Sequence, residues 1–174
     1  SLILRPALSS SEASRLTLLT AVVLSEAVES CTGLRPLIKW PNDLLLNGKK
    51  LAGILIELRA QVDRVDFAVV GVGLNVNTAL KDLPPEATSL SEEKGAPCGR
   101  VALIREILRA FEKRYLSLKK QGFGTALEEW RRRSATIGGR VRFEDRGRKH
   151  EGTAIGLADD GGFQPRLLGN FEDR

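Results

Sequence analysis

Histidine, methionine and cysteine are scarce in this chain of 174 residues, which has one histidine, no methionine and two cysteines. Cys31 and Cys98 lie too far apart for a disulfide framework, and together with His150 they are too few for a recurring zinc motif. We expect two buried or inert thiols and a surface histidine. Because methionine is absent, we also expect that Ser1 is not the natural first residue.

Long apolar runs are missing as well. No stretch reaches the roughly 20 apolar residues that a membrane-spanning helix needs, and no basic segment leads into an apolar one as in a secretory signal. We therefore expect a soluble, cytoplasmic protein without a membrane segment.

Aromatic residues make up only 5% of the chain, although its net charge is +5 and its pI about 9.5. Such charge permits contact with nucleic acid, nucleotide phosphates or an acidic protein. A nucleic-acid-binding domain would interleave aromatic residues with its positive charges, so this function is disfavoured. We interpret the basic residues as a solvated surface. They are Arg131, Arg132, Arg133, Arg140, Arg142, Arg146, Arg148 and Lys149.

Helical patterns occupy two parts of the sequence. Ser9 to Glu12 has the Ser-x-x-Glu form of a capping box, and apolar residues at helical spacing follow, which predicts a helix through about Glu29. Helical spacing returns from Val101 to Leu118, and a shorter helix is expected from Thr125 to Arg133. We expect these helices to cover one face of a sheet.

Strand patterns lie between the helical ones. The runs Asp43–Leu46 and Leu51–Ile56 are joined through Asn47-Gly48, the strongest short hairpin signal. A third run, Val65–Val72, ends in glycines and leads into a loop with two prolines. The sequence therefore predicts an α+β fold.

After Gly138-Gly139 the pattern changes to short strands again, with turns at Gly147 and at residues 159–162. We expect a small all-β appendage, and divide the chain into residues 1–136 and 137–174. Because proline cannot donate to a central ladder, we expect the tail Pro165–Arg174 to be disordered or displaced.

The chemistry is concentrated near the hairpin. Asn42 and Asp43 beside one strand, and Lys50 at the start of the next, bring acidic and anion-binding groups to one sheet edge, where a nucleotide could bind. Glycines at 71 and 73 would let the backbone approach a ligand, and the amides of Asn75 and Asn77 could orient phosphate or ribose oxygens. The spacing is not the dinucleotide fingerprint, because a third glycine is absent.

Each of these motifs also has an ordinary structural explanation. Lys39 and Trp40 could be an edge position and a core anchor. Pro41-Asn42-Asp43 could be a plain turn, and the glycines merely the end of a strand. Taken singly, the motifs leave both interpretations open.

In combination, the blocks Lys39–Asp43, Lys50–Glu57 and Gly71–Asn75, in this order and at these separations, resemble the catalytic core of biotin protein ligases. Trp130–Val141 resembles the join to that family's small C-terminal domain. The resemblance covers about Ser1 to Leu157. It implies a mixed sheet covered by helices, forming an N-terminally incomplete catalytic domain at 1–136, and an SH3-like β domain at 137–174.

The resemblance also implies a reaction. The family uses ATP and Mg²⁺ to form biotinyl-5'-AMP, then transfers biotin to a lysine of a biotin carboxyl carrier protein domain of an acyl-CoA carboxylase. By this match Lys50 is the principal catalytic candidate, and Asp43 is a candidate base or Mg²⁺ ligand. The implied substrate- and nucleotide-binding residues are Lys39, Trp40, Asn42, Gly53, Gly71, Gly73 and Asn75.

The sequence departs from the family at its start, where nothing before Ser1 supplies the glycine- and arginine-rich loop that closes over biotin. We expect impaired or absent activity if this chain is the whole molecule. The alternatives are a lipoate-type ligase, against which the Lys39–Asp43 block argues, and a catalytically inactive fragment that binds biotin or the carrier. Some family members carry a helix-turn-helix domain that these residues lack, so we predict no sequence-specific DNA binding. A homodimer is compatible with the family, and the sequence does not decide it.

Overall fold

A computed structural model describes residues 1–9, 12, 14–61, 64–145, 147–158 and 161–170. Its main sheet has five strands in the order β1-β5-β4-β3-β2. They are β1 (Leu2–Leu4), β2 (Leu37–Lys39), β3 (Asp43–Leu46), β4 (Lys49–Gln61) and β5 (Arg64–Leu74). Neighbouring strands pair antiparallel, and parallel pairing among the described residues is confined to isolated bridges. The predicted α+β class, with a sheet covered by helices, is confirmed.

The hairpin that joins β3 to β4 is where the sequence predicted it. Asn47 and Gly48 have φ angles of 51° and 79°. Positive φ at both central residues is the requirement of a type I′ turn, whose twist matches that of the flanking strands. β4 and β5 run further than the sequence indicated, because they pair with each other from Ala52 opposite Leu74 to Gln61 opposite Arg64.

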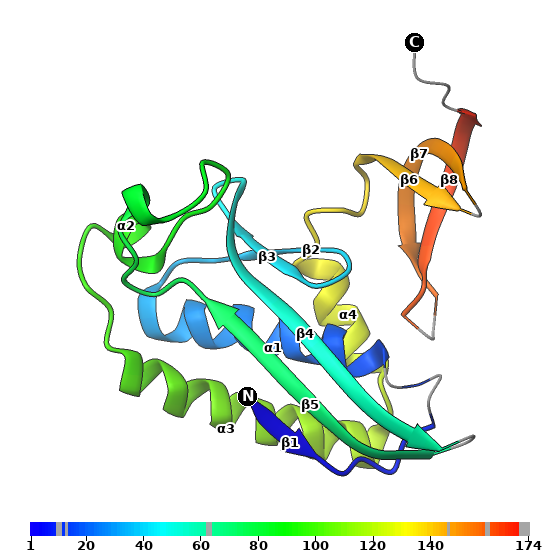
Figure 1. Cartoon of the computed structure of the whole chain (residues 1–174). Helices are drawn as coiled ribbons and strands as arrows, with labels where there is room; N and C mark the ends of the chain where they lie inside the picture. The colour runs from blue at the N-terminus through cyan, green and yellow to red at the C-terminus, as the bar shows by residue number, and fades with distance from the viewer. Residues whose placement is uncertain (10–11, 13, 62–63, 146, 159–160, 171–174) are drawn as a thin grey trace.

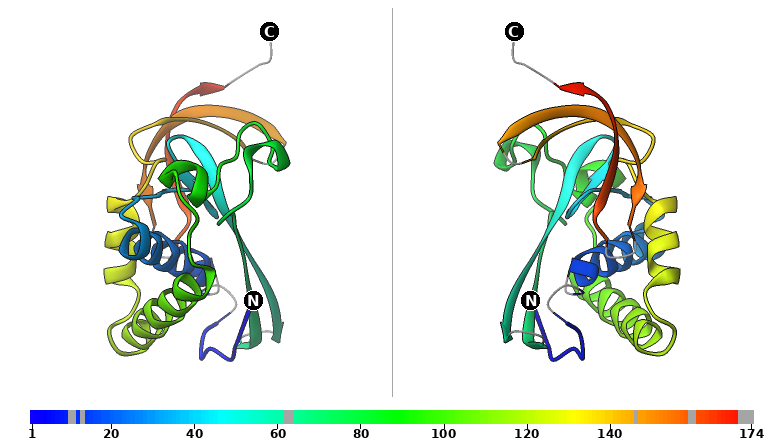
Figure 2. Two further views of the ribbon diagram at one scale, coloured as in Figure 1. Left: turned by 90° about the vertical axis from the view of Figure 1, so that its left-hand side faces the viewer. Right: turned by 90° about the vertical axis from the view of Figure 1, so that its right-hand side faces the viewer.

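Helices cover one face of this sheet and leave the other open (Figures 1 and 2). The helices are α1 (Ser14–Thr32), α2 (Leu90–Lys94), α3 (Arg100–Gln121) and α4 (Gly124–Arg132), with a 3-10 turn at Leu80–Asp82. The capping prediction is supported at Glu12, whose carboxylate accepts from Ser9 N at 3.1 Å and from Ser9 Oγ at 2.9 Å. Residues 10, 11 and 13 lie outside the described part.

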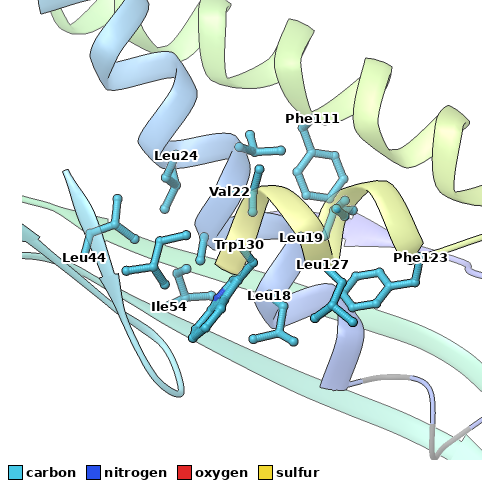
Figure 3. Close-up of a cluster of buried hydrophobic side chains, with 14 of the residues drawn as sticks. Leu18, Leu19, Val22, Leu24, Leu44, Ile54, Phe111, Phe123, Leu127 and Trp130 are labelled. Atoms are coloured by element: carbon cyan, nitrogen blue, oxygen red, sulfur yellow. The ribbon is translucent and has the colours of Figure 1, made fainter. Parts of the chain in front are cut away.

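The core fills the space between the sheet and the helices (Figure 3). α1 is apolar nearly all round because it packs against the sheet, α3 and α4 at once, and its Leu19 and Val22 are fully buried. Ile54 reaches this cluster from β4, and Trp130 from α4. None of the helices in the described ranges is long and apolar enough to cross a membrane.

A second sheet has the order β6-β7-β8, formed by β6 (Arg140–Asp145), β7 (Arg148–Leu157) and β8 (Phe163–Asn170). The prediction that the tail from Pro165 is disordered or displaced is wrong as far as Asn170, because Pro165 pairs opposite Ala154. β8 is an outer strand of this sheet and its register shifts at this point, so a missing N–H donor is tolerated. Residues 171–174 lie outside the described part.

Residues of the smaller sheet pack against the main core. Leu157 and Phe163 of the smaller sheet join the main core cluster, and Arg131 Nη2 donates to Leu157 O at 2.9 Å. His150 is half-buried rather than on the open surface, with its ring stacked on Phe143 at a centroid distance of 5.4 Å.

The two cysteines lie in different surroundings. Cys98 is buried, as expected, whereas Cys31 is exposed. Partial desolvation and the nearby charge of Glu106 raise the pKa of the Cys31 thiol, which keeps it protonated and weakly nucleophilic.

Candidate functional site

Four of the residues singled out from the sequence form one row across the main sheet. In the strand register, Lys39 lies opposite Asp43, Asp43 opposite Gly53, and Gly53 opposite Gly73. Residues that lie opposite one another share a face, and successive residues alternate between faces. Ile54 is buried under the helices. The row therefore lies on the open face of the sheet.

Lys50 joins this row through an ion pair. Its Nζ lies 2.7 Å from Asp43 Oδ1, and the two side chains are 47% and 21% exposed. The pair stands directly over Gly53, where an added Cβ would lie 3.5 Å from both Nζ and Oδ1. A cation that is positioned by a neighbour and still reaches solvent is accessible to an incoming anion.

The backbone of Lys50 is also anchored. Lys50 N donates to Glu86 O at 2.8 Å, and Thr88 N donates to Lys50 O at 2.9 Å. These bonds come from the loop with two prolines that follows β5. The loop therefore determines where the Lys50 side chain begins, a role that its sequence did not reveal.

Asn42 fastens the turn between β2 and β3 to the next strand. Its Nδ2 donates to Ile54 O at 2.8 Å, and Ile54 N donates back to Asn42 O at 2.9 Å. The side chain thus extends the ladder by one residue beyond Asp43. One N–H of this amide group holds the turn, so a contact of Asn42 with a ligand would involve its second N–H or its Oδ1.

Trp40 is half-buried and is held by residues far along the chain. Its backbone N–H donates to Thr136 Oγ1 at 3.0 Å. Its ring lies 5.2 Å from that of Phe163, and its Nε1 donates to Gly161 O at 3.5 Å, a long contact. Sequence reasoning missed both Thr136 and Phe163. Thr136 lies in the Trp130–Val141 segment, which was singled out only as a join, and Phe163 belongs to no motif.

The segment after β5 is braced internally. Asn75 Nδ2 donates to Thr88 O at 3.1 Å. Asn77 uses both ends of its amide, donating to Cys98 O at 3.0 Å and accepting from Cys98 N at 2.9 Å. These contacts give both asparagines a structural role, and the expected contact of Asn75 with a nucleotide stays a prediction.

Gly71 lies one pair further along the same face, opposite Leu55. An added Cβ there would come within 3.3 Å of Leu55 O. Together with Gly53 and Gly73, it leaves a strip of bare backbone beside the Lys50–Asp43 pair. A flat ligand can therefore approach the main chain closely.

Metal binding would depend on Asp43. Within the described ranges, no group of three or more His, Cys, Asp or Glu side chains is arranged to hold a metal ion. Mg²⁺ usually takes one or two carboxylates and completes its shell with water and substrate phosphates. Asp43 has a second carboxylate oxygen besides the one paired with Lys50, so it fits a Mg²⁺ that brings its other ligands with it.

A separate apolar pocket of about 480 Å³ lies on the helix side, between β5 and α3. Val70, Val72, Leu103 and Ile107 are among its lining residues. Residues 70 and 72 alternate with the open-face glycines 71 and 73, so this pocket and the Lys50 row lie on opposite faces of β5.

Comparison with known proteins identifies the part of the chain that carries the row. Residues 1–75 match the model of the Biotin/lipoate A/B protein ligase family. This matched segment makes up less than half of the chain. The catalytic and binding candidates from Lys39 to Asn75 fall within this matched segment, and Asn77 lies just beyond it.

Named relatives are similar to this chain beyond residues 1–75 as well. The bifunctional ligase/repressor BirA of Bacillus subtilis is 41% identical over 165 residues, which cover 92% of this chain and 51% of that protein. The biotin–[acetyl-CoA-carboxylase] ligase of Mycobacterium tuberculosis is 40% identical over 130 residues, 75% of this chain and 46% of that one. The chain spans about half the length of these relatives. Its relatives are enzymes.

Solved structures agree. The biotin protein ligase of Aquifex aeolicus superposes with a TM-score of 0.82 at 28% identity, covering 98% of this chain and 75% of that one. The same ligase in complex with biotin and ATP gives a TM-score of 0.76 at 27% identity, covering 98% and 77%. The resemblance inferred from the sequence is confirmed at the level of family and fold.

Proposed function

We propose that this chain is catalytic machinery of a biotin protein ligase, which makes biotinyl-5'-AMP from biotin and ATP and transfers biotin to a lysine of a biotin carboxyl carrier protein. The observation that carries the proposal is the Lys50–Asp43 pair standing over the glycine strip. Relatives named as biotin ligases, and a structural neighbour that binds biotin and ATP, support it.

In the first step, a biotin carboxylate oxygen bonds to the α-phosphorus of ATP, and the bond from that phosphorus to the bridging oxygen breaks, releasing pyrophosphate. Two anions must meet, so a fixed cation at their junction lowers the barrier. Lys50 supplies this charge, and Asp43 orients it. Mg²⁺ bound with ATP near Asp43 would offset further phosphate charge.

In the second step, the amine of the carrier lysine bonds to the biotinyl carbonyl carbon, and AMP leaves with the electron pair of the broken C–O bond. The amine must be neutral, whereas an ordinary lysine has a pKa of about 10.4. Asp43 is the proposed acceptor of the proton that the amine loses. Among the open-face row residues it is the one carboxylate.

The remaining assignments follow from the same likeness. Lys39, Trp40 and Gly53 are proposed to contact the adenylate, and Gly71 and Gly73 to lie against biotin. Residues 1–136 are proposed as the catalytic unit, and 137–174 as an SH3-like unit. The carrier is proposed to belong to an acyl-CoA carboxylase, because a relative is named as a ligase for that enzyme. Two free cysteines are compatible with the cytoplasm.

Isothermal titration calorimetry with biotin, ATP and Mg²⁺ tests the site. Wild-type chain should release binding heat that Lys50→Ala abolishes. Lys49→Ala is the matched control, since Lys49 is an exposed lysine of the same hairpin. Equal heats in both variants would contradict the role of Lys50, and no heat from folded wild type would contradict the function. Tighter binding of lipoate than of biotin would favour the lipoate-type alternative.

A further inference from the structure

Trp40 connects the motif turn to the C-terminal third of the chain. The turn leads from Trp40 through Asn42 to Asp43, the partner of Lys50. The contacts that hold Trp40 come from Thr136 and Phe163, which follow α4. The shape of the site beside Lys50 therefore depends on a segment that shares no motif with it.

The segment just before Thr136 forms an isolated parallel bridge with β2. Ile38 N donates to Arg133 O at 2.7 Å, and Ala135 N donates to Ile38 O at 2.8 Å, giving a parallel bridge between Ile38 and Ser134. Thr136 is the next residue that can reach the motif turn, and its hydroxyl accepts the Trp40 N–H.

Thr136 is itself fixed in place. Ser134 Oγ accepts from the backbone N–H groups of Thr136 and Ile137, each at 3.0 Å. Arg133, at the head of the segment, is buried and pairs with Glu129 at 2.6 Å and Glu29 at 2.7 Å. These bonds fix the backbone of Thr136, and so the point from which its hydroxyl reaches Trp40.

We propose that Thr136 is a positioning residue for the nucleotide end of the site, acting through the amide and ring of Trp40. The inference rests on the proposed ligase function. Trp40 supplies a half-buried aromatic surface of the kind on which nucleotide bases stack. The glycines proposed for biotin lie on β5, three strands from β2. Loss of the Thr136 hydroxyl should therefore weaken nucleotide binding and spare biotin binding.

Thr136→Val removes the acceptor and keeps the branched shape, while Thr136→Ser keeps the acceptor. Thr153→Val is the matched control, a half-buried threonine of β7. Calorimetry would give the Kd of biotin alone and of ATP with biotin present, and scanning calorimetry the Tm. We expect Thr136→Val to weaken ATP binding up to about tenfold, the upper range for one hydrogen bond, with biotin changed less than about twofold. Thr136→Ser and Thr153→Val should match wild type.

Two results overturn the positioning role while leaving the ligase function standing. One is wild-type ATP affinity in Thr136→Val. The other is an equal loss for biotin and ATP with a lowered Tm, which would show a general structural role. If folded wild type binds neither ligand, the proposed function fails and the positioning role fails with it.

Discussion

The two faces of the main sheet are built from the same strands but have different roles. On the helix side, Ile54 is 2% exposed and belongs to the core. On the open side its neighbours are Gly53 and Leu55, and Leu55 is 65% exposed. Strand alternation alone assigns these residues to opposite faces. One face therefore stabilises the fold, and the other is free to carry charge and bare backbone.

This division explains why the open face can hold an ion pair and glycines without weakening the domain. Glycine in a strand has no side chain to pack against its neighbours, which lowers stability. Here the cost falls on the face that contributes little burial, while the helix face is filled by α1, α3 and α4 (Figure 3). Substitutions at adjacent positions should accordingly separate stability from binding.

The largest effect is expected from Ile54→Ala. Truncating a fully packed side chain leaves a cavity and should lower the free energy of unfolding by about 2–5 kcal/mol. Leu55→Ala, one residue further on the open face, should change it by less than about 0.5 kcal/mol. Urea denaturation measures both. Similar losses in the two variants would mean that the open face is covered in solution.

Gly53→Ala should weaken ligand binding while leaving stability largely unchanged. Its added Cβ would sit at ordinary contact distance, 3.5 Å, from Lys50 and Asp43, so the fold should be retained. The methyl group would cover backbone that a ligand needs, and we expect about tenfold weaker ATP and biotin binding, as for other overpacked sites. Calorimetry provides the measurement.

Gly124→Ala controls for the change of glycine itself, because nothing lies within 4 Å of a Cβ there and the residue starts α4. It should bind ligands as wild type does. Unchanged binding in Gly53→Ala would show that the bare strip is not a contact surface.

The sequence predicted the local parts of this arrangement well. Asn47-Gly48 specifies a two-residue turn, and the turn sets which residues of β3 and β4 face each other. The meeting of Lys50 with Asp43 follows from that hairpin. Apolar spacing likewise predicted α1, α3 and α4, whereas the short helix α2 was not predicted.

Long-range contacts were not predictable in this way. Thr136 reaches Trp40 across 96 positions in sequence through a single hydroxyl acceptor, which leaves no periodic or compositional signal. The prediction that the tail from Pro165 is disordered or displaced was wrong for a related reason. Proline is excluded from central strands only, and sequence alone does not say that β8 is an outer strand.

Acid should affect the helix side through Glu129. Burial alone would raise the pKa of Glu129, but the hydrogen bond and charge of Arg133 outweigh it and bring the pKa below the ordinary 4.5. The unfolded chain therefore takes up the proton first. The stability that this carboxylate contributes is present above pH 4.5 and is lost as pH falls through its lower folded pKa.

Urea denaturation between pH 7 and pH 3 would measure the loss, at most about 1.4 kcal/mol per pH unit for one proton. Glu129→Gln should flatten this slope without abolishing it, because Glu12, whose pKa is lowered by hydrogen bonds from Ser9, titrates in the same direction. Glu128→Gln, on an exposed position of the same helix, should keep the wild-type slope. An unchanged slope in Glu129→Gln would show that the Glu129–Arg133 ion pair does not contribute to the loss of stability in acid.

Only a small effect on stability is expected from Lys50→Ala, the variant with the largest expected effect on binding. The ammonium is 47% exposed, and ion pairs with such access to water contribute about 0–1 kcal/mol. Water can hydrate Asp43 once Lys50 is gone, since that side chain is 21% exposed. Urea denaturation should show a loss under about 1 kcal/mol that shrinks further in salt, because screening already weakens the pair in wild type. A loss as large as that of Ile54→Ala would make the pair part of the scaffold, and the open face would then stabilise the fold as the helix face does.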